Sequence, residues 1–206
     1  MQVNETARTL PGITMKTIVV FFGMTASGKS TLGMAWAQAC GAAYHNTDRV
    51  RKELAGVQAT DRCPDQVAGG IYAPAFTEKT YRALLDRAER DFSQGYKMVV
   101  LDGSYSRRRD RDQVRILARQ IGAQGVFIFC TCADTEVRRR LERRAGDPAA
   151  VSDGRWEIYL HQQKTFEVPD PLVVEEACIN LNTEQGVEVI LAWLAEHPLL
   201  RESCRP

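Results

Sequence analysis

The sequence predicts an α/β protein in three layers, in which helices cover both faces of a five-stranded parallel sheet. Two observations predict this fold class. Short apolar runs alternate with longer amphipathic segments along the 206 residues, as is typical of parallel strands that crossover helices bury on both faces. In addition, 44% of the residues are hydrophobic and 26% are charged, which is close to the average of globular proteins. We therefore expect one substantial core.

Five apolar runs are the predicted strands. In chain order they are residues 17–22, 43–45, 97–101, 125–131 and, with a weaker signal, 177–181. The longest uninterrupted apolar run, Ile18 to Phe22, has far fewer residues than a helix needs to cross a bilayer. We therefore expect no membrane partner.

The segments between these runs predict helices. They are residues 30–40, 49–55, 77–94, 110–121, 134–144, 153–166 and 184–196. The helix over 77–94 has one apolar stripe, formed by Tyr81, Leu84, Leu85, Ala88 and Phe92. A stripe with this spacing more often packs against a core than contacts a ligand, so we expect it to face the sheet.

The predicted domain spans residues 15–197 and is flanked by two tails. Residues 1–14 are polar and lack the apolar centre of a secretory signal, so we expect a flexible N-terminal tail. Residues 198–206 are expected to form a C-terminal tail. Two stretches rich in Gly, Pro, Ala and Asp, 56–72 and 145–152, are predicted to be mobile loops.

Charge and cysteine usage restrict the class of protein. The chain has 27 basic and 26 acidic residues, so it lacks the overall positive charge of a general nucleic-acid binder. Its six cysteines include no CxxC pair, which favours buried, reduced thiols over a zinc site or a disulfide framework. We expect a soluble cytoplasmic protein that is a monomer or a homodimer.

One glycine-rich stretch carries a strong signal for phosphate binding. Residues 23–30, GMTASGKS, match the P-loop pattern G-x-x-x-x-G-K-[ST] and lie between a predicted strand and a predicted helix. The glycines allow successive N–H groups to turn inward, where they bind phosphate together with the helix N-terminus. We expect Lys29 to reach the β- and γ-phosphates of a nucleotide and the Ser30 hydroxyl to bind Mg²⁺. The predicted nucleotide-binding residues are Gly23, Thr25, Ala26, Ser27, Gly28, Lys29, Ser30 and Thr31.

Two aspartates follow apolar runs and are predicted to face the P-loop, because ligands of open parallel sheets bind at the carboxyl ends of the strands. Asp48 can accept the proton of an attacking hydroxyl, or it can cap the next helix. Arg51, one turn later, is either an acceptor ligand or a solvated helix residue. Asp102 ends the run MVVLD and suits a metal site for Mg²⁺, although an Asp-Gly turn is the alternative.

A group of arginines lies on the helix predicted over 134–144. Its members are Arg138, Arg140, Arg143 and Arg144. Guanidinium groups beside a γ-phosphate stabilise the charge of the transferred group, whereas a solvated face paired with Glu136 and Glu142 is the alternative. We expect two or three of these arginines to contact phosphate. A second basic cluster, SRRRDRDQVR, is predicted to be the start of a helix.

The order of these segments resembles a known family. The segments are GMTASGKSTL, TDRVRKELAG, YAPAFTEKTYRALL, VVLDGSYSRR, EVRRRLERR and SDGRWEIYLHQQKTFE. They are similar to P-loop kinases of the AAA-domain or predicted ATP-binding kinase family, which is related to gluconate kinase, chloramphenicol phosphotransferase, zeta toxins and polynucleotide kinase. The resemblance implies a P-loop NTPase fold like that of adenylate kinase, with a helical lid, and ATP-dependent transfer of phosphate to a hydroxyl.

The resemblance also implies roles for individual residues. Asp48 matches the acceptor-side aspartate taken as the general base, and Arg51 matches an acceptor-binding arginine in the D-x-x-R spacing of polynucleotide kinases. Arg138, Arg140 and Arg144 match the lid pattern R-x-R-L-x-x-R. The expected catalytic residues are Lys29, Asp48, Arg138 and Arg140, with Arg144 on the nucleotide. The expected acceptor-binding residues are Asp48, Arg51, Tyr72 and Asp102.

Three functions are compatible with these motifs. The first is an ATP-dependent kinase that phosphorylates a hydroxyl of a small molecule. The second is a polynucleotide 5′-hydroxyl kinase, which the D-x-x-R spacing favours and the near-neutral charge disfavours. The third is a nucleotide-dependent switch or binding module, although the NKxD motif of GTPases is absent from the sequence. The segment VQATDRCPDQVAGG has no recognisable acceptor-specific signature, so the sequence leaves the acceptor unnamed.

Overall fold

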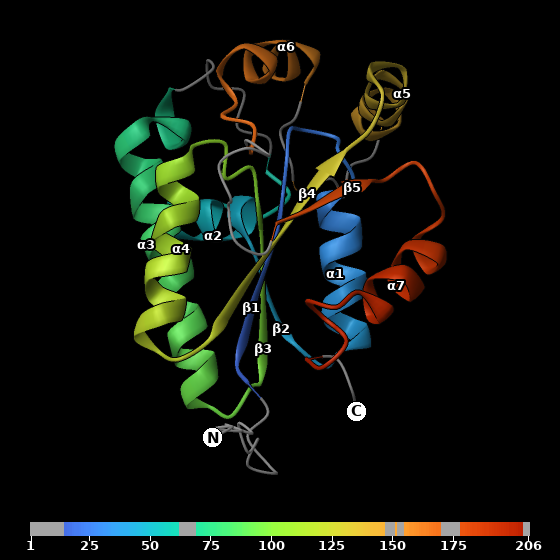
Figure 1. The fold of residues 1–206 in the computed structure, drawn as a ribbon. Coiled ribbons are helices and arrows are strands. Elements are labelled where there is room, and N and C mark those ends of the chain that lie inside the picture. The colour runs from blue at the N-terminus through green and yellow to red at the C-terminus, as the bar shows by residue number, and fades with distance from the viewer. Residues whose placement is uncertain (1–14, 62–68, 147–150, 152–154, 170–177, 204–206) are drawn as a thin grey trace, which may run out of the picture.

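The computed structural model describes residues 15–61, 69–146, 151, 155–169 and 178–203 (Figure 1). The strands are β1 (Thr17–Phe22), β2 (Ala43–Asn46), β3 (Met98–Gly103), β4 (Gln124–Thr131) and β5 (Cys178–Asn182). All pair in parallel, in the order β2-β3-β1-β4-β5. The predicted α/β fold with a five-stranded parallel sheet is therefore confirmed. The N-terminal tail predicted over 1–14 lies outside the described residues.

Each predicted helix is present, with ends that differ by a few residues. The helices are α1 (Lys29–Ala39), α2 (Thr47–Leu54), α3 (Pro74–Ser93), α4 (Arg108–Gln120), α5 (Asp134–Ala145), α6 (Trp156–Thr165) and α7 (Val187–Glu196), and η1 (Gly70–Tyr72) is a 3-10 turn. α3 begins earlier than predicted because Pro74 occupies its first turn, where proline is well tolerated. Within the described segments, no helix is both long enough and apolar enough to cross a membrane.

The helices cover the sheet from both sides, with α2, α3 and α4 on one face and α1 and α7 on the other (Figure 1). β1 shows why, since its side chains alternate between two cores. Ile18, Val20 and Phe22 join the core under α3 and α4. Val19 and Phe21 join the core under α1 and α7. The central strand is therefore buried on both faces, as the run of apolar residues predicts.

The predicted stripe of α3 faces the first of these cores. Tyr81, Leu84, Ala88 and Phe92 are buried there, and Leu85 is half-buried against the same cluster. The prediction from the 3.6-residue period, that this stripe faces the sheet, is therefore confirmed.

α5 and α6 lie beyond the carboxyl-terminal end of the sheet, where the predicted lid is expected (Figure 1). A small apolar cluster joins them to the P-loop. Ala26 of the loop packs with Val137 and Leu141 of α5 and with Tyr159 of α6. The Tyr159 hydroxyl also donates a hydrogen bond to Asp134 across 2.6 Å. The two lid helices are thus packed on each other and on the phosphate-binding loop.

The folded region extends beyond the boundary predicted at residue 197. Leu200 is fully buried in the core under α1 and α7, and the hydroxyl oxygens of Ser203 and Thr17 are 2.9 Å apart. The described part of the predicted tail 198–206 therefore packs against the domain. The sequence did not predict this because the short segment has too few apolar residues to show a period.

The cysteines differ from the prediction at one position. Cys40, at the end of α1, is disulfide-bonded, whereas Cys130, Cys132 and Cys178 are free thiols. The prediction of reduced thiols is therefore wrong at Cys40. It relied on the absence of closely spaced cysteine pairs, which does not exclude a disulfide bond.

Candidate active site

The P-loop has the backbone conformation that its glycines permit. Gly23 and Gly28 have φ angles of 147° and 86°, values that residues with a Cβ rarely adopt. A Cβ at Gly28 would lie 2.9 Å from Thr183 Oγ1 and 3.0 Å from Arg140 Nη1. A Cβ at Gly23 would overlap the carbonyl oxygen of Cys130. Both glycines are therefore required by conformation and by space.

Lys29 places its ammonium inside the loop. Its Nζ donates a hydrogen bond to the carbonyl oxygen of Met24 across 3.2 Å. Burial lowers the pKa of Lys29, the charge of Asp102 opposes that shift, and the charge of Arg144 adds to it. Lys29 therefore lies within electrostatic reach of one predicted metal ligand and one predicted lid residue.

Asp102 is fully buried in β3, which continues to Gly103 and pairs with β1. It is therefore a strand residue and not the first residue of an Asp-Gly turn. Its Oδ2 accepts hydrogen bonds from the Tyr44 hydroxyl at 2.7 Å and from Asn46 Nδ2 at 2.5 Å. Its Oδ1 is buried and has no hydrogen-bond partner among the described residues. One carboxylate oxygen is thus fixed by β2, and the other is left for a further ligand.

Asp48 lies in the first turn of α2 but does not cap the helix. The capping residue is Asn46, whose side-chain oxygen accepts the N–H of Arg49 across 3.0 Å. Burial raises the pKa of Asp48, and the nearby charges of Arg51 and Lys29 oppose that rise. Asp48 therefore does not cap α2, and its carboxyl group lies close enough to the P-loop lysine for the two charges to interact.

Arg51 is buried, with 5% of its surface exposed, so it is not a solvated helix residue. Its Nη1 donates to the Ile71 carbonyl at 2.9 Å and to Thr77 Oγ1 at 3.1 Å. The guanidinium also lies 4.9 Å from the centre of the Tyr72 ring. The structure therefore brings together three predicted acceptor residues, Asp48, Arg51 and Tyr72, on neighbouring elements. We call these three residues the acceptor wall.

Lys52, the next residue along α2, was not predicted to have a role. It is fully buried, and its Nζ donates to the carbonyl oxygens of Ala59, Asp61 and Val151 across 3.2, 2.8 and 2.7 Å. One ammonium thus fastens the segment after α2 to a residue between α5 and α6.

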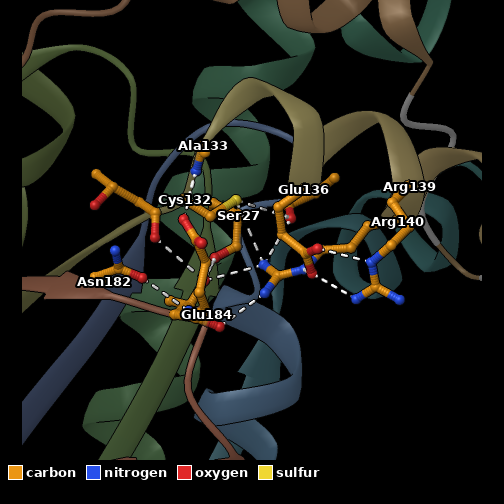
Figure 2. A network of polar contacts seen from close by, with 11 residues as sticks. Ser27, Cys132, Ala133, Glu136, Arg139, Arg140, Asn182 and Glu184 are labelled. Carbon is orange, nitrogen blue, oxygen red and sulfur yellow. Dashed lines mark hydrogen bonds and ion pairs between the residues drawn. The ribbon is translucent and has the colours of Figure 1, made fainter.

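Arg140 connects α5 to the P-loop (Figure 2). Its Nη1 donates to the Ala26 carbonyl at 3.1 Å and to Thr183 Oγ1 at 3.0 Å, and its Nη2 donates to the Thr183 carbonyl at 2.7 Å. Thr183 Oγ1 in turn donates to the Ser27 carbonyl at 2.7 Å. These contacts hold the loop through its carbonyl oxygens.

Glu136 lies between two arginines of the same helix (Figure 2). It accepts hydrogen bonds from Arg139, which is exposed, and from Arg140, which is half-buried. The hydrogen bonds from Arg139 and then Arg140 hold the pKa of Glu136 at about 2. Two of the arginines thus pair with Glu136, which was the alternative to phosphate contact in the sequence analysis. Arg140 contacts the P-loop as well.

The structure does not bring Arg138 to the P-loop. Its guanidinium lies 3.7 Å from the centre of the Trp156 ring, so it stacks on α6. Arg144 is nearer to the predicted site, since its charge acts on Lys29. The three arginines of the R-x-R-L-x-x-R pattern therefore have different surroundings. Arg138 stacks on Trp156 of α6. Arg140 binds a P-loop carbonyl oxygen, and the charge of Arg144 acts on Lys29.

A cavity of about 500 Å³ opens next to the loop. Its lining comes from the P-loop and the first turns of α1 (Ala26, Gly28, Thr31, Leu32), from α5 (Glu136, Arg139, Arg140, Arg143, Arg144) and from the turn after β5 (183–187). This volume is in the range of small-molecule sites. A cationic cavity that continues into a P-loop suits a nucleotide.

Several contacts at the site involve residues that sequence reasoning missed. Thr183 follows β5, and Tyr44 belongs to β2. Gln162 of α6 accepts the N–H of Thr25 through its Oε1 across 2.7 Å. Of these residues and Asn46, only Asn46 had a usable signal, because an Asn before a helical segment is a common cap. The others act through contacts between distant segments.

Solved structures of kinases share this fold. The chain resembles a gluconokinase from Sinorhizobium meliloti 1021 (22% identity, TM-score 0.56, covering 92% of this chain and 89% of that one). It also resembles the APS kinase of Mycobacterium tuberculosis in complex with AMPPNP and APS (18% identity, TM-score 0.61, covering 91% and 98%). A sugar kinase from Janibacter sp. HTCC2649 has 17% identity and a TM-score of 0.59, with coverage of 88% and 92%. At these identities the likeness shows the fold.

Curated relatives share sequence over part of their length. Uncharacterized proteins of Mycobacterium tuberculosis and Mycobacterium bovis are 29% identical over 124 residues, which is 60% of this chain and 25% of each relative. The matched stretch is thus a quarter of those proteins. The family model described as an AAA domain matches residues 18–169, which is most of the chain and includes the P-loop, Asp48, Asp102 and α5. The chain therefore belongs to the AAA-domain family, and its fold is that of P-loop kinases.

Proposed function

We propose that this protein is an ATP-dependent kinase that transfers the γ-phosphate of ATP to a hydroxyl group of a small molecule, with Asp48 as the general base. The observation that carries the proposal is the convergence of Lys29, Asp48 and Asp102 at the carboxyl ends of neighbouring strands, where their charges act on one another. Phosphoryl transfer needs this combination of a phosphate cradle, an acidic metal ligand and a carboxylate that faces the acceptor.

The proposed reaction follows from the positions of these groups. The acceptor hydroxyl binds at the acceptor wall and gives its proton to Asp48 while its oxygen forms a bond to the γ-phosphorus. The bond between that phosphorus and the β,γ-bridging oxygen breaks, and ADP leaves with the electron pair. Lys29 and the loop N–H groups stabilise the phosphate charge. The raised pKa of Asp48 makes it a stronger base than an ordinary aspartate.

The residues present fit both ATP and Mg²⁺. Gly23 and Gly28 leave no space for a Cβ and adopt positive φ angles, the backbone conformation with which a P-loop turns its N–H groups toward phosphate. The unpartnered Oδ1 of Asp102 is suited to accept from a metal-bound water. Ser30, in the first turn of α1, and Asp102 would hold the ion. When bound, Mg²⁺ neutralises charge on the β- and γ-phosphates.

The test is a phosphate-transfer screen. Protein is incubated with γ-labelled ATP, fractionated metabolites and a panel of 5′-hydroxyl oligonucleotides, and the species that gains label is identified. A labelled small molecule, together with loss of transfer in Asp48→Asn at nearly unchanged ATP affinity, supports the proposal. Wild-type turnover in Asp48→Asn with the true acceptor contradicts the assigned base.

The same screen addresses the two other functions. A labelled oligonucleotide, bound with an affinity that falls steeply with salt, indicates a polynucleotide kinase. The near balance of 27 basic and 26 acidic residues disfavours that function. ATP binding with no labelled product, and with partner binding that Asp48→Asn leaves unchanged, indicates a switch or binding module.

A further inference from the structure

The peptide between Met24 and Thr25 is held at both of its polar atoms. Its carbonyl oxygen accepts from Lys29 Nζ across 3.2 Å. Its N–H donates across 2.7 Å to Oε1 of Gln162, a half-buried residue of α6. A side chain from the lid helix thus occupies a P-loop amide, the kind of group that binds phosphate.

The position of this peptide indicates which phosphate the amide serves. The lining of the cavity that suits the nucleoside includes Ala26, Gly28 and Thr31 but neither Met24 nor Thr25. The Met24–Thr25 peptide lies beside the ammonium that P-loop lysines place on the β- and γ-phosphates. We therefore infer that the phosphate chain of a bound nucleotide runs toward Thr25, with the terminal phosphate at the N–H that Gln162 holds.

We propose that Gln162 recognises the terminal phosphate and thereby distinguishes a nucleoside triphosphate from a diphosphate. This role rests on the proposed function, because it assumes that the loop binds ATP. The triphosphate displaces Oε1 from the Thr25 N–H, and the side-chain amide then turns so that Nε2 donates to a γ-phosphate oxygen. The diphosphate has no group at this position and leaves the contact between Gln162 and Thr25 intact.

The chemistry of glutamine suits this exchange. Its amide carries an acceptor and a donor on one rotatable group, so one residue can satisfy the loop N–H before binding and the phosphate after it. Among the described residues, Nε2 of Gln162 has no hydrogen-bond partner, so it remains available to donate.

The anchoring of α6 on both sides of Gln162 localises the change. Before it, the Tyr159 hydroxyl donates to Asp134, and the ring packs against Ala26. After it, Phe166 is buried with its ring 6.5 Å from that of Phe22 and 5.6 Å from that of Phe129. With the helix fixed at both ends, rotation of one side chain is sufficient for the exchange.

Binding measurements with a charge-matched control test this role without an acceptor. The affinities of the purified protein for ADP and for the non-hydrolysable analogue AMPPNP are measured by calorimetry for wild type, Gln162→Glu and Gln163→Glu. A carboxylate at position 162 can still accept the hydrogen bond from the Thr25 N–H, but it repels the γ-phosphate. We expect Gln162→Glu to weaken AMPPNP at least about ten-fold more than ADP, a difference of ~1.4 kcal/mol. Gln163, which contacts Asp134 and Tyr159, should change the ratio less than about two-fold.

The outcomes separate this role from the proposed function. Equal weakening of ADP and AMPPNP by Gln162→Glu, or an equal change of the ratio in Gln163→Glu, overturns the role of Gln162. If the wild type binds neither nucleotide, the proposed kinase function itself fails. NMR of the wild type gives a second readout that does not depend on folding of a variant. AMPPNP should shift the Gln162 side-chain amide and the Thr25 N–H, and ADP should leave both nearly unchanged; equal shifts with both ligands contradict the proposal.

Discussion

Arg140 donates a hydrogen bond to the carbonyl oxygen of Ala26 across 3.1 Å and so joins the lid helix to the phosphate-binding loop. Both residues were expected to contact the nucleotide. The structure places the Arg140 guanidinium on the carbonyl oxygens of Ala26 and Thr183. Arg140 therefore stabilises the conformation of the loop. Its replacement should lower the free energy of unfolding as well as the affinity for nucleotide.

Arg140→Lys should destabilise the protein and weaken ATP binding. Lysine cannot donate to Ala26 and Thr183 at once, because it lacks the planar fork of arginine. Loss of one charged hydrogen bond corresponds to about 2 kcal/mol, and we expect a fall of that size in the free energy of unfolding measured in urea. Arg139→Lys is the control, since Arg139 binds the same Glu136 from an exposed position. Equal effects of the two substitutions would refute this assignment.

Gly28→Ala should lower the free energy of unfolding more than Gly41→Ala does. Gly28 and Gly41 both have positive φ angles, 86° and 60°, but only at Gly28 would a Cβ meet other atoms within 4 Å. Left-handed backbone costs a residue with a Cβ about 1–2 kcal/mol at either position, and overpacking adds roughly 1–3 kcal/mol at Gly28. Thermal unfolding of both variants checks this. ATP binding should be lost in Gly28→Ala and retained in Gly41→Ala, and a variant Gly28→Ala that binds ATP normally would argue against the loop as the phosphate site.

The strands and helices could be predicted because each depends on a local pattern. The buried run Thr17–Phe22 and the stripe of α3 show their periods within one segment, and both are confirmed. The loop motif is equally local. Thr183 and Gln162 were missed because each contacts the loop from more than 100 residues away. Arg138 and Arg140 are two residues apart on one helix, yet one stacks on Trp156 and the other binds Ala26, a difference that depends on how α6 packs.

Lys52→Met should loosen the segment after α2 without removing a nucleotide contact. The ammonium of Lys52 binds the carbonyl oxygens of Ala59, Asp61 and Val151, and methionine keeps the apolar stem but cannot donate. We expect the amide of Asp61, which donates to Gln58, to exchange with deuterium at least about ten-fold faster, since ~1.4 kcal/mol is a factor of ten. Arg49→Met, at an exposed position of the same helix, should leave this exchange rate unchanged. An unchanged rate in Lys52→Met would disprove the fastening role.

Asp48→Asn should stabilise the ligand-free protein at neutral pH. Burial raises the pKa of Asp48 in the folded state above its ordinary value of 3.8. A raised folded pKa means that the contribution of Asp48 to stability is complete below the unfolded pKa and is lost as pH rises through the folded pKa. Asparagine does not ionise, so at pH 7 the variant avoids the cost of a buried carboxylate.

The measurement is the Tm of wild type and Asp48→Asn as a function of pH. We expect a higher Tm for the variant at pH 7, by roughly 2–4 °C for each kcal/mol in a domain of this size, and convergence of the two curves on acidification through the folded pKa. The exposed Asp86→Asn on α3 is the control and should show little difference at any pH. A lower Tm of Asp48→Asn at pH 7 would contradict the raised pKa.

The acceptor wall and the nucleotide cavity come from different stretches of the chain. Asp48, Arg51 and Tyr72 fall within residues 44–77, whereas the cavity draws on the P-loop, α5 and the turn after β5. Under the proposed function, separate segments of the chain would therefore bind the acceptor and the nucleotide. Under the proposed function, we expect exchange of residues 44–77 between two members of the family to change the acceptor preference while the P-loop stays in place.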